Sequence, residues 1–142
     1  MFKQISIFAE NKKGSLRAMT KLLFENNINI YGSVTNDSAE YGIVRLIVSD
    51  TDKAKKAFTA AGYMCKLDNV IGIEIDDKPG ALDSILKDIE DANININYTY
   101  VTFGRQSNKP VVILSAEDLS EIEDNLKSKG YVSVNPDCAS EN

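Results

Sequence analysis

Two short stretches of the chain combine residue types that could bind a small anion or a zwitterion. The first, residues 10–16, reads ENKKGSL, and the second, residues 76–82, reads DDKPGAL. Each places a glycine, Gly14 or Gly80, just before a segment whose apolar residues have helical spacing. A glycine at this position lets the backbone turn sharply and leaves the first amides of the helix unpaired. These amides, at the positive end of the helix dipole, can hold an anion such as a carboxylate.

Side chains in and after the first stretch could bind further polar groups of a small ligand. The carboxamides of Asn11 and Asn29 can donate and accept hydrogen bonds, so they could bind an ammonium group and a carboxylate together. In the second stretch Asp77 replaces the asparagine. Its negative charge would repel a ligand carboxylate, so we expect the Asn11 stretch to form the tighter site. Alternatively, Asp77 could hold the ligand ammonium or a cation, or it could cap its own helix.

The composition argues against several other kinds of chemistry. The chain has no histidine, and Cys65 and Cys138 lack the spacing of a metal or redox motif. We therefore expect two reduced thiols, no catalytic residue, no metal and no cofactor. A net charge of −5 argues against binding to nucleic acid or to an anionic membrane. Because no signal peptide and no membrane-spanning apolar run is evident, the sequence favours a cytoplasmic protein.

Two similar sets of elements must position the two stretches. In both sets the apolar pattern predicts the order strand, helix, strand, strand, helix, strand. The first set is expected to have strands at 4–8, 30–35, 42–48 and 63–67 and a helix at 16–26. Its second helix is expected to be capped by Asp50 or Asp52 and to end at 61. The second is expected to have strands at 70–75, 97–103, 111–114 and 131–134 and helices at 82–92 and 119–126.

Local signals mark several helix ends. We expect Asn27 and Asn93 to end the first helix of each set and Gly62 to end the second helix of the first set. Ser115 with Asp118 is typical of a capping box that opens the last helix.

The order of elements predicts an α+β protein with two antiparallel sheets, each carrying both of its helices on one face. We expect one repeat at residues 1–68, the other at 69–135 and a tail at 136–142. Open sheet edges invite pairing, so the two repeats should lie side by side. Residues 43–48 are apolar on both faces of their strand. The helix-free face should therefore be the interface of a homodimer or a higher oligomer.

With these patterns in hand, both halves resemble ACT domains, and the whole chain resembles stand-alone proteins built from two of them. The two glycine stretches carry the resemblance, together with the sequence NINI at 27–30 and again at 93–96. The resemblance implies a ferredoxin-like fold for each repeat and a non-catalytic, allosteric, regulatory role. ACT domains pair through their second strands and bind free amino acids where the loop of one domain faces the partner domain. The implied protein partner is an enzyme of amino-acid metabolism.

The resemblance also implies where the amino acid binds. By position, the contacts would come from Asn11, Gly14 and Asn29 in the first repeat and from Gly80 and Asn95 in the second. The chain departs from the family pattern at Lys13, where proline is usual, as well as at Asp77. The full set of expected ligand-binding residues is Asn11, Lys13, Gly14, Ser15, Leu16, Asn29, Ile30, Asp77, Pro79, Gly80, Ala81, Leu82, Asn95 and Ile96.

Two alternatives share the same order of elements. An acylphosphatase-like hydrolase needs an arginine in the anion-binding loop, but Arg17 lies within the expected first helix and Asp83 takes its place in the second repeat. An RNA-recognition domain needs stacking aromatics on its third strand and positive charge, whereas residues 43–48 contain no aromatic residue. We therefore favour the amino-acid sensor and keep the small enzyme as the alternative.

Overall fold

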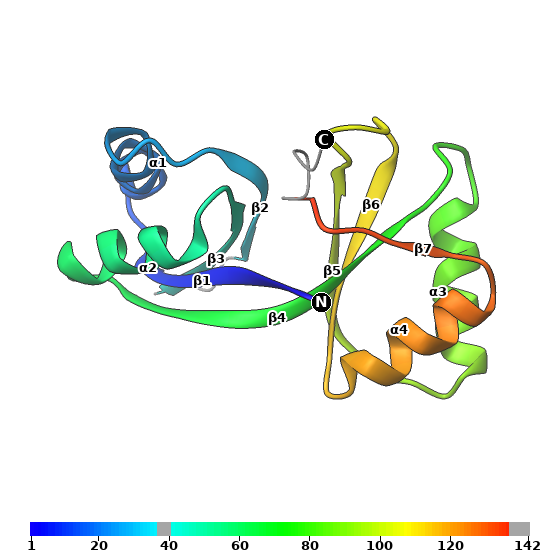
Figure 1. Cartoon of the computed structure of the whole chain (residues 1–142). Coiled ribbons are helices and arrows are strands. Elements are labelled where there is room, and N and C mark those ends of the chain that lie inside the picture. The colour runs from blue at the N-terminus through cyan, green and yellow to red at the C-terminus, as the bar shows by residue number, and fades with distance from the viewer. Residues whose placement is uncertain (37–40, 137–142) are drawn as a thin grey trace. The chain divides into compact units, whose positions relative to one another are not determined.

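The computed structural model describes residues 1–36 and 41–136 of the chain. The tail predicted at 136–142 therefore lies outside the described residues from residue 137 onward, as does Cys138. The elements follow the predicted order (Figure 1). Their bounds are β1 (Phe2–Glu10), α1 (Ser15–Glu25), β2 (Ile30–Asn36), β3 (Tyr41–Val48), α2 (Thr51–Ala60), β4 (Met64–Glu74), α3 (Ala81–Asp91), β5 (Ile96–Phe103), β6 (Pro110–Ala116), α4 (Leu119–Ser128) and β7 (Val132–Ser133).

The chain divides into two compact units, which correspond closely to the two repeats. One unit is Lys3–Asp68, and the other runs from Asn69 onward and includes Met1 and Phe2. In the first unit the strands lie in the order β2, β3, β1 and then the start of β4. In the second unit the order is β5, β6, the end of β4 and then β7. Strand pairing is antiparallel in both sheets, so the α+β class and the ferredoxin-like repeats are confirmed.

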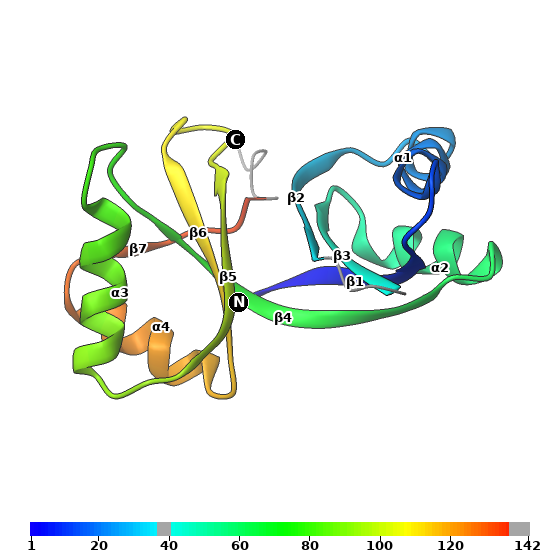
Figure 2. The same cartoon turned by 180° about the vertical axis from the view of Figure 1, so that it is seen from behind.

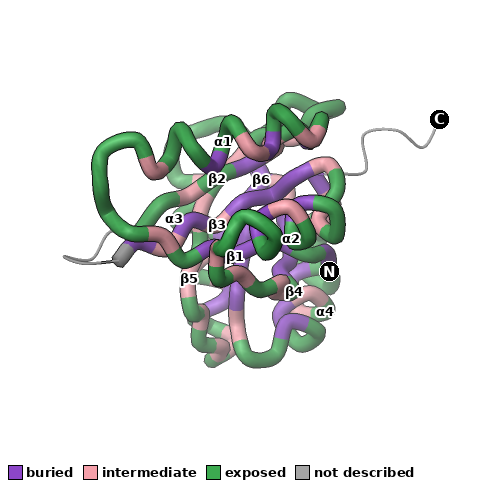
Figure 3. Tube along the Cα trace, turned by 90° about the vertical axis from the view of Figure 1, so that its left-hand side faces the viewer, coloured by how far each residue is buried: buried purple, intermediate pink, exposed green. Residues whose placement is uncertain are grey.

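The core of the first unit lies between its sheet and its two helices. Ile5 and Ile7 of β1 are fully buried, because alternate residues of a strand point to the same face of the sheet. Met19 and Leu23 of α1 and Phe58 of α2 pack against that face. Figure 3 shows buried residues gathered on the strands, while the outer turns of the helices are exposed.

The second unit repeats this arrangement with different residues. Ile71 and Ile73 of β4 face the same core as Ile85 and Ile89 of α3 and Leu126 of α4. Each of these side chains is at most 2% exposed. The helix pair α3 and α4 can be followed from behind in Figure 2. In both units, therefore, the two helices cover one face of the sheet, as the sequence predicted.

Strand β4 differs from the prediction. The sequence predicted separate strands at 63–67 and 70–75, but the structure has one strand of 11 residues from Met64 to Glu74. Its burial changes from alternating in the first part to continuous at residues 70–73. No glycine or proline breaks the chain between 64 and 71, so nothing local stops the strand.

Most of the predicted helix ends are present. Asn27 and Asn93 both adopt a left-handed conformation with φ of 56°. Gly62 does the same with φ of 89° and ends α2 as expected. The predicted capping box at α4 is wrong: Asp118 itself is the cap, and its carboxylate accepts a hydrogen bond from the Glu121 amide at 2.9 Å. Ser115 is instead a buried residue of β6.

Candidate functional site

The helices that follow the two glycine stretches begin without a side-chain cap. Gly14 precedes α1 with φ of 86°, and Gly80 precedes α3 with φ of 87°. By contrast, α2 and α4 open at Asp50 and Asp118, whose carboxylates accept a backbone hydrogen bond from the first turn. A carboxylate at the cap would occupy the place of an anionic ligand. Among the four helices within residues 1–36 and 41–136, only α1 and α3 thus begin without a side-chain cap.

The first loop is held in shape by its own hydrogen bonds. The Ser15 hydroxyl donates to the Glu10 carbonyl at 2.9 Å, and the Ser15 amide donates to the Lys12 carbonyl at 3.2 Å. The Lys12 ammonium lies 3.0 Å from the Glu10 carboxylate, so these two charges largely neutralise each other. The amides at the start of α1 therefore project from a loop that is already in place, which lowers the ordering cost of binding.

A cavity of about 420 Å³ lies beside this loop, within the first unit. Four of the predicted ligand-binding residues line it: Asn11, Gly14, Ser15 and Leu16. The remaining lining residues are Ala9, Glu10, Lys12, Arg17, Thr35, Asn36, Gly42 and Val44. We call this space the Asn11 cavity.

The Asn11 cavity combines an anion-binding end with an apolar floor. The open first turn of α1 and the Arg17 guanidinium, also on α1, can both attract a carboxylate. Asn11 brings a carboxamide that can donate or accept. Ala9 and Val44 contribute apolar surface from β1 and β3. Such an arrangement can hold a carboxylate at one end and an uncharged group at the other.

Asn29 and Ile30 do not join this cavity within one repeat. They lie at the start of β2, where Ile30 is opposite Val48, whereas the cavity lies at the other end of β3, near Gly42. The Asn29 side chain accepts a hydrogen bond from the Ile30 amide at 2.9 Å, and the Asn29 amide donates to the Ser49 hydroxyl at 2.9 Å. Asn29 therefore has a structural role at the start of the strand.

The second loop is exposed to solvent, as the first loop is. Asp77, Pro79, Gly80 and Leu82 are exposed. Ala81 lines a cavity of about 360 Å³ together with residues at the end of β4, in the connection between α4 and β7, and at the start of β7. The remaining predicted residues, Asn95 and Ile96, lie at the start of β5, and Ile96 is opposite Ala116 at the far end of β6 from Pro110. Hence, as in the first repeat, the structure separates the loop from the residues after the helix.

Lys13 lines a further cavity, of about 530 Å³, which lies on the β4 side of the first loop. This cavity and the Ala81 cavity occupy equivalent places in the two repeats. Tyr63 lines the first and Tyr131 the second, each directly after the glycine that ends the preceding helix. Each of the two repeats thus has a cavity beneath its loop, next to the last strand of the unit.

The two tyrosines have different partners. The Tyr63 ring packs edge-on against Phe58 with centroids 5.5 Å apart. The Tyr131 hydroxyl instead donates to the Asp88 carboxylate at 2.7 Å. This hydrogen bond is the main reason that the pKa of Asp88 is lowered, with Lys129 adding to the effect. Burial and then Asp88 raise the pKa of Tyr131 to about 12. Tyr131 therefore ties α3 to the segment after α4 and stays protonated at neutral pH.

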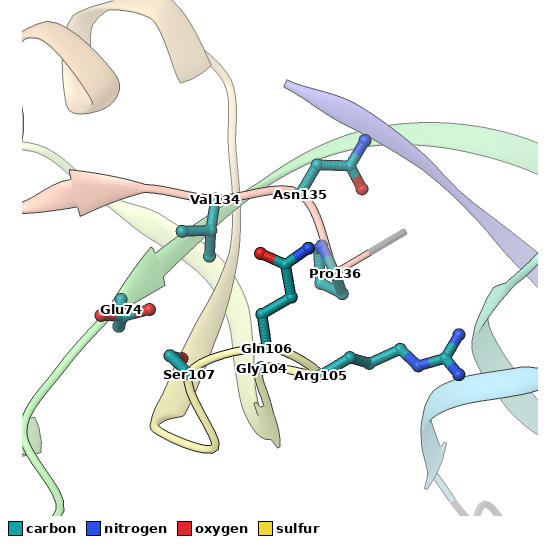
Figure 4. Close-up of a pocket in the computed structure, with 8 residues that line it drawn as sticks. All are labelled: Glu74, Gly104, Arg105, Gln106, Ser107, Val134, Asn135 and Pro136. Atoms are coloured by element: carbon teal, nitrogen blue, oxygen red, sulfur yellow. The ribbon is translucent and has the colours of Figure 1, made fainter. Parts of the chain in front are cut away.

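A small cavity of about 130 Å³ in the second unit was not predicted from the sequence. It lies between the β5–β6 turn, the end of β4 at Glu74 and the segment from Val134 to Pro136. Figure 4 shows the Gln106 side chain extending from the turn toward Pro136, whereas Arg105 points away from it. The lining is mostly polar and contains backbone of the turn, so this cavity fits a few water molecules better than an organic ligand.

Within residues 1–36 and 41–136, no group of three or more acidic or cysteine side chains is placed to hold a metal ion. Over the same residues, every helix is too short or too polar to cross a bilayer. Cys65 carries a free thiol.

Six residues that line the Asn11 cavity lie outside the 10–16 stretch and were not predicted from the sequence. They are Ala9, Arg17, Thr35, Asn36, Gly42 and Val44. Strand pairing brings most of them to the loop, and the pairing register is not visible in a single sequence. One signal was present: Ala9 and Gly42 are smaller than Ile75 and Pro110 at the equivalent positions of the second repeat.

Comparisons with known proteins agree with the fold described above. The family model for the ACT domain pair matches residues 1–129. The crystal structure of protein BT0572 from Bacteroides thetaiotaomicron has a TM-score of 0.86 and 32% identity, covering 95% of this chain and 92% of that chain. The ligand-free regulatory subunit of aspartate kinase from Thermus thermophilus has a TM-score of 0.63 and 16% identity, covering 89% and 91%. At that identity the likeness concerns the fold alone. No curated protein matches the chain.

Proposed function

We propose that this chain, which belongs to the ACT domain pair family, is a non-catalytic regulatory protein that binds a free amino acid in the Asn11 cavity. The observation that carries the proposal is the cavity of about 420 Å³ at the uncapped start of α1. The ligand carboxylate would accept hydrogen bonds from the Leu16 and Arg17 amides of α1 and pair with the Arg17 guanidinium. Asn11 would bind the α-ammonium group through its carboxamide oxygen.

Thermal unfolding in the presence of each of the twenty amino acids tests this proposal. A ligand that binds only the folded state must raise the Tm, by an amount that grows with its concentration above Kd. We expect one amino acid or a small related group to raise the Tm, and titration calorimetry to give a Kd for it. If all twenty leave the Tm unchanged at millimolar concentration, the proposed function is wrong.

The proposed partner is an enzyme of amino-acid metabolism, in the cytoplasm. Two similar structures are regulatory subunits of aspartate kinase, from Thermus thermophilus and Thermus flavus, so this architecture serves such enzymes elsewhere. A net charge of −5 disfavours nucleic acid and anionic membranes as partners. Binding of the amino acid would then change the affinity for the enzyme by a coupling free energy, the basis of an allosteric effect.

We also propose that the chain forms a homodimer. Residues 43–48 do not form the expected interface, because apolar residues such as Ile47 are buried within the chain. The proposal is supported instead by strand β5. This strand ends the order of the second sheet, and its Val101 and Phe103 are 46% and 53% exposed. An edge strand with apolar side chains favours pairing with another strand. Light scattering at micromolar concentration should give the mass of a dimer, and Val101→Lys should reduce it to that of a monomer. A monomeric parent protein would contradict this.

A further inference from the structure

Two of the smallest residues in the chain form the floor of the Asn11 cavity. Ala9 of β1 lies directly opposite Gly42 of β3 in the antiparallel pair. Two residues further from the loop on each strand, Ile7 lies opposite Val44, and both belong to the core of the first unit. Because residues two apart in a strand share a face, Ala9 and Gly42 continue that core face toward the loop. Their small size leaves the space that larger core residues would fill.

The second repeat shows what larger residues do at these positions. Ile75 corresponds to Ala9, and Pro110 corresponds to Gly42 in the strand pairing, since the Ile75 amide donates to the Pro110 carbonyl at 3.0 Å. Ile75 is 9% exposed and belongs to the core of the second unit, and Pro110 is buried. In the second repeat, larger side chains therefore occupy the positions of Ala9 and Gly42.

We infer that the Ala9–Gly42 floor receives the ligand side chain and limits its size, and that the ligand is an amino acid with an uncharged aliphatic side chain. This inference rests on the proposed amino-acid site. The floor and its adjoining wall are Ala9, Gly42, Val44 and Leu16, all without charge. Burying a charged side chain against them without a partner would be unfavourable. The charges that do line the cavity are those of Arg17 and of the Glu10–Lys12 pair.

The floor can be raised with only a small shift of the backbone. A methyl group added at Gly42 would meet the Asn36 carbonyl oxygen at 3.3 Å, a tight contact that a small shift relieves, and Gly42 is not in a left-handed conformation. Ala9→Val adds bulk at the neighbouring position with a residue that favours strands. Each substitution reduces the depth of the cavity beneath the ligand side chain.

Titration calorimetry with leucine, valine, alanine, aspartate and lysine tests the inference on the whole chain. We expect the parent protein to bind leucine or valine at least tenfold more tightly than aspartate or lysine. Gly42→Ala and Ala9→Val should each weaken that binding by tenfold or more, the discrimination expected for one or two carbon atoms in a fitted pocket. Binding of alanine should change by less than about threefold, so the size preference shifts toward the smaller ligand.

The matched control is Ala60→Val, the same chemical change at an exposed position of α2 outside the cavity lining. It should leave all five affinities unchanged. The inference is overturned if the floor variants weaken the affinity for all five ligands equally, or if both variants keep the ligand preference of the parent. It is also overturned if the parent binds aspartate or lysine more tightly than leucine and valine. In each of these cases amino-acid binding itself would remain. If no amino acid binds the parent protein, the proposed function fails, and the inference fails with it.

Discussion

Replacing Phe58 by alanine is expected to lower the free energy of unfolding by about 3–5 kcal/mol. Phe58 is fully buried, and its ring packs against Tyr63 as well as against the core of the first unit. The loss combines the burial of a large apolar side chain with the cavity that remains when the core cannot close around it. A domain of this size has a total stability of roughly 3–10 kcal/mol, so the change takes away much of what holds the first unit together. Urea unfolding followed by circular dichroism measures it.

Phe24 provides the matched control. It lies on α1 of the same unit but is 81% exposed, so Phe24→Ala should change the free energy of unfolding by less than about 0.5 kcal/mol. Two phenylalanines of one unit would then differ severalfold in effect because of burial alone. Similar losses for the two variants would mean that Phe58 does not lie in the core.

Local sequence signals correctly predicted the helices next to both glycine loops. Asn27 and Asn93 are left-handed residues that follow the end of a helix, and Gly14 and Gly80 are left-handed glycines that precede one. Neither depends on which strand lies next to which. The order of elements and the uncapped starts of α1 and α3 therefore followed from short stretches of sequence.

Features that depend on packing were harder to predict. The continuous β4 arises because its second part is buried on both faces, which removes the alternating pattern that marks a strand's limits. Similarly, Ser115 has the sequence of a cap, but it continues β6 and pairs with Tyr98. Asp118 then takes the cap position three residues later.

In the candidate site, too, the local features were predicted and the features that depend on strand pairing were not. Asn11 and residues 14–16 were predicted because the loop that carries them is contiguous in sequence. Asn29 was placed with them by resemblance, yet it lies at the other end of β2 from Thr35 and Asn36, which do reach the cavity. Strand register decides which end of β2 meets the loop, and register follows from long-range pairing that one sequence does not reveal.

The two loops should differ in affinity because both charge and space differ between them. Asp77 carries a negative charge near the open start of α3, where a ligand carboxylate would rest. Repulsion between like charges a few ångströms apart at a partly shielded surface is on the order of one to a few kcal/mol, comparable to what a helix start and a few hydrogen bonds contribute. Beneath that loop, Ile75 and Pro110 are buried where Ala9 and Gly42 leave a cavity. Both differences favour the Asn11 cavity.

Asn11→Ala is therefore expected to weaken the tightest amino-acid binding by tenfold or more, since it removes the carboxamide beside the open start of α1 while the loop keeps its Ser15 hydrogen bonds. Asp77→Asn is the comparison: it should leave the tight site unchanged and strengthen any weaker binding at the second loop. Calorimetric titration with the amino acid that raises the Tm most measures both effects and the number of sites. Parent-like binding by Asn11→Ala, together with loss of binding in Asp77→Asn, would place the tight site at the second loop instead. That outcome would mean that Asp77 holds the ligand ammonium rather than repelling its carboxylate.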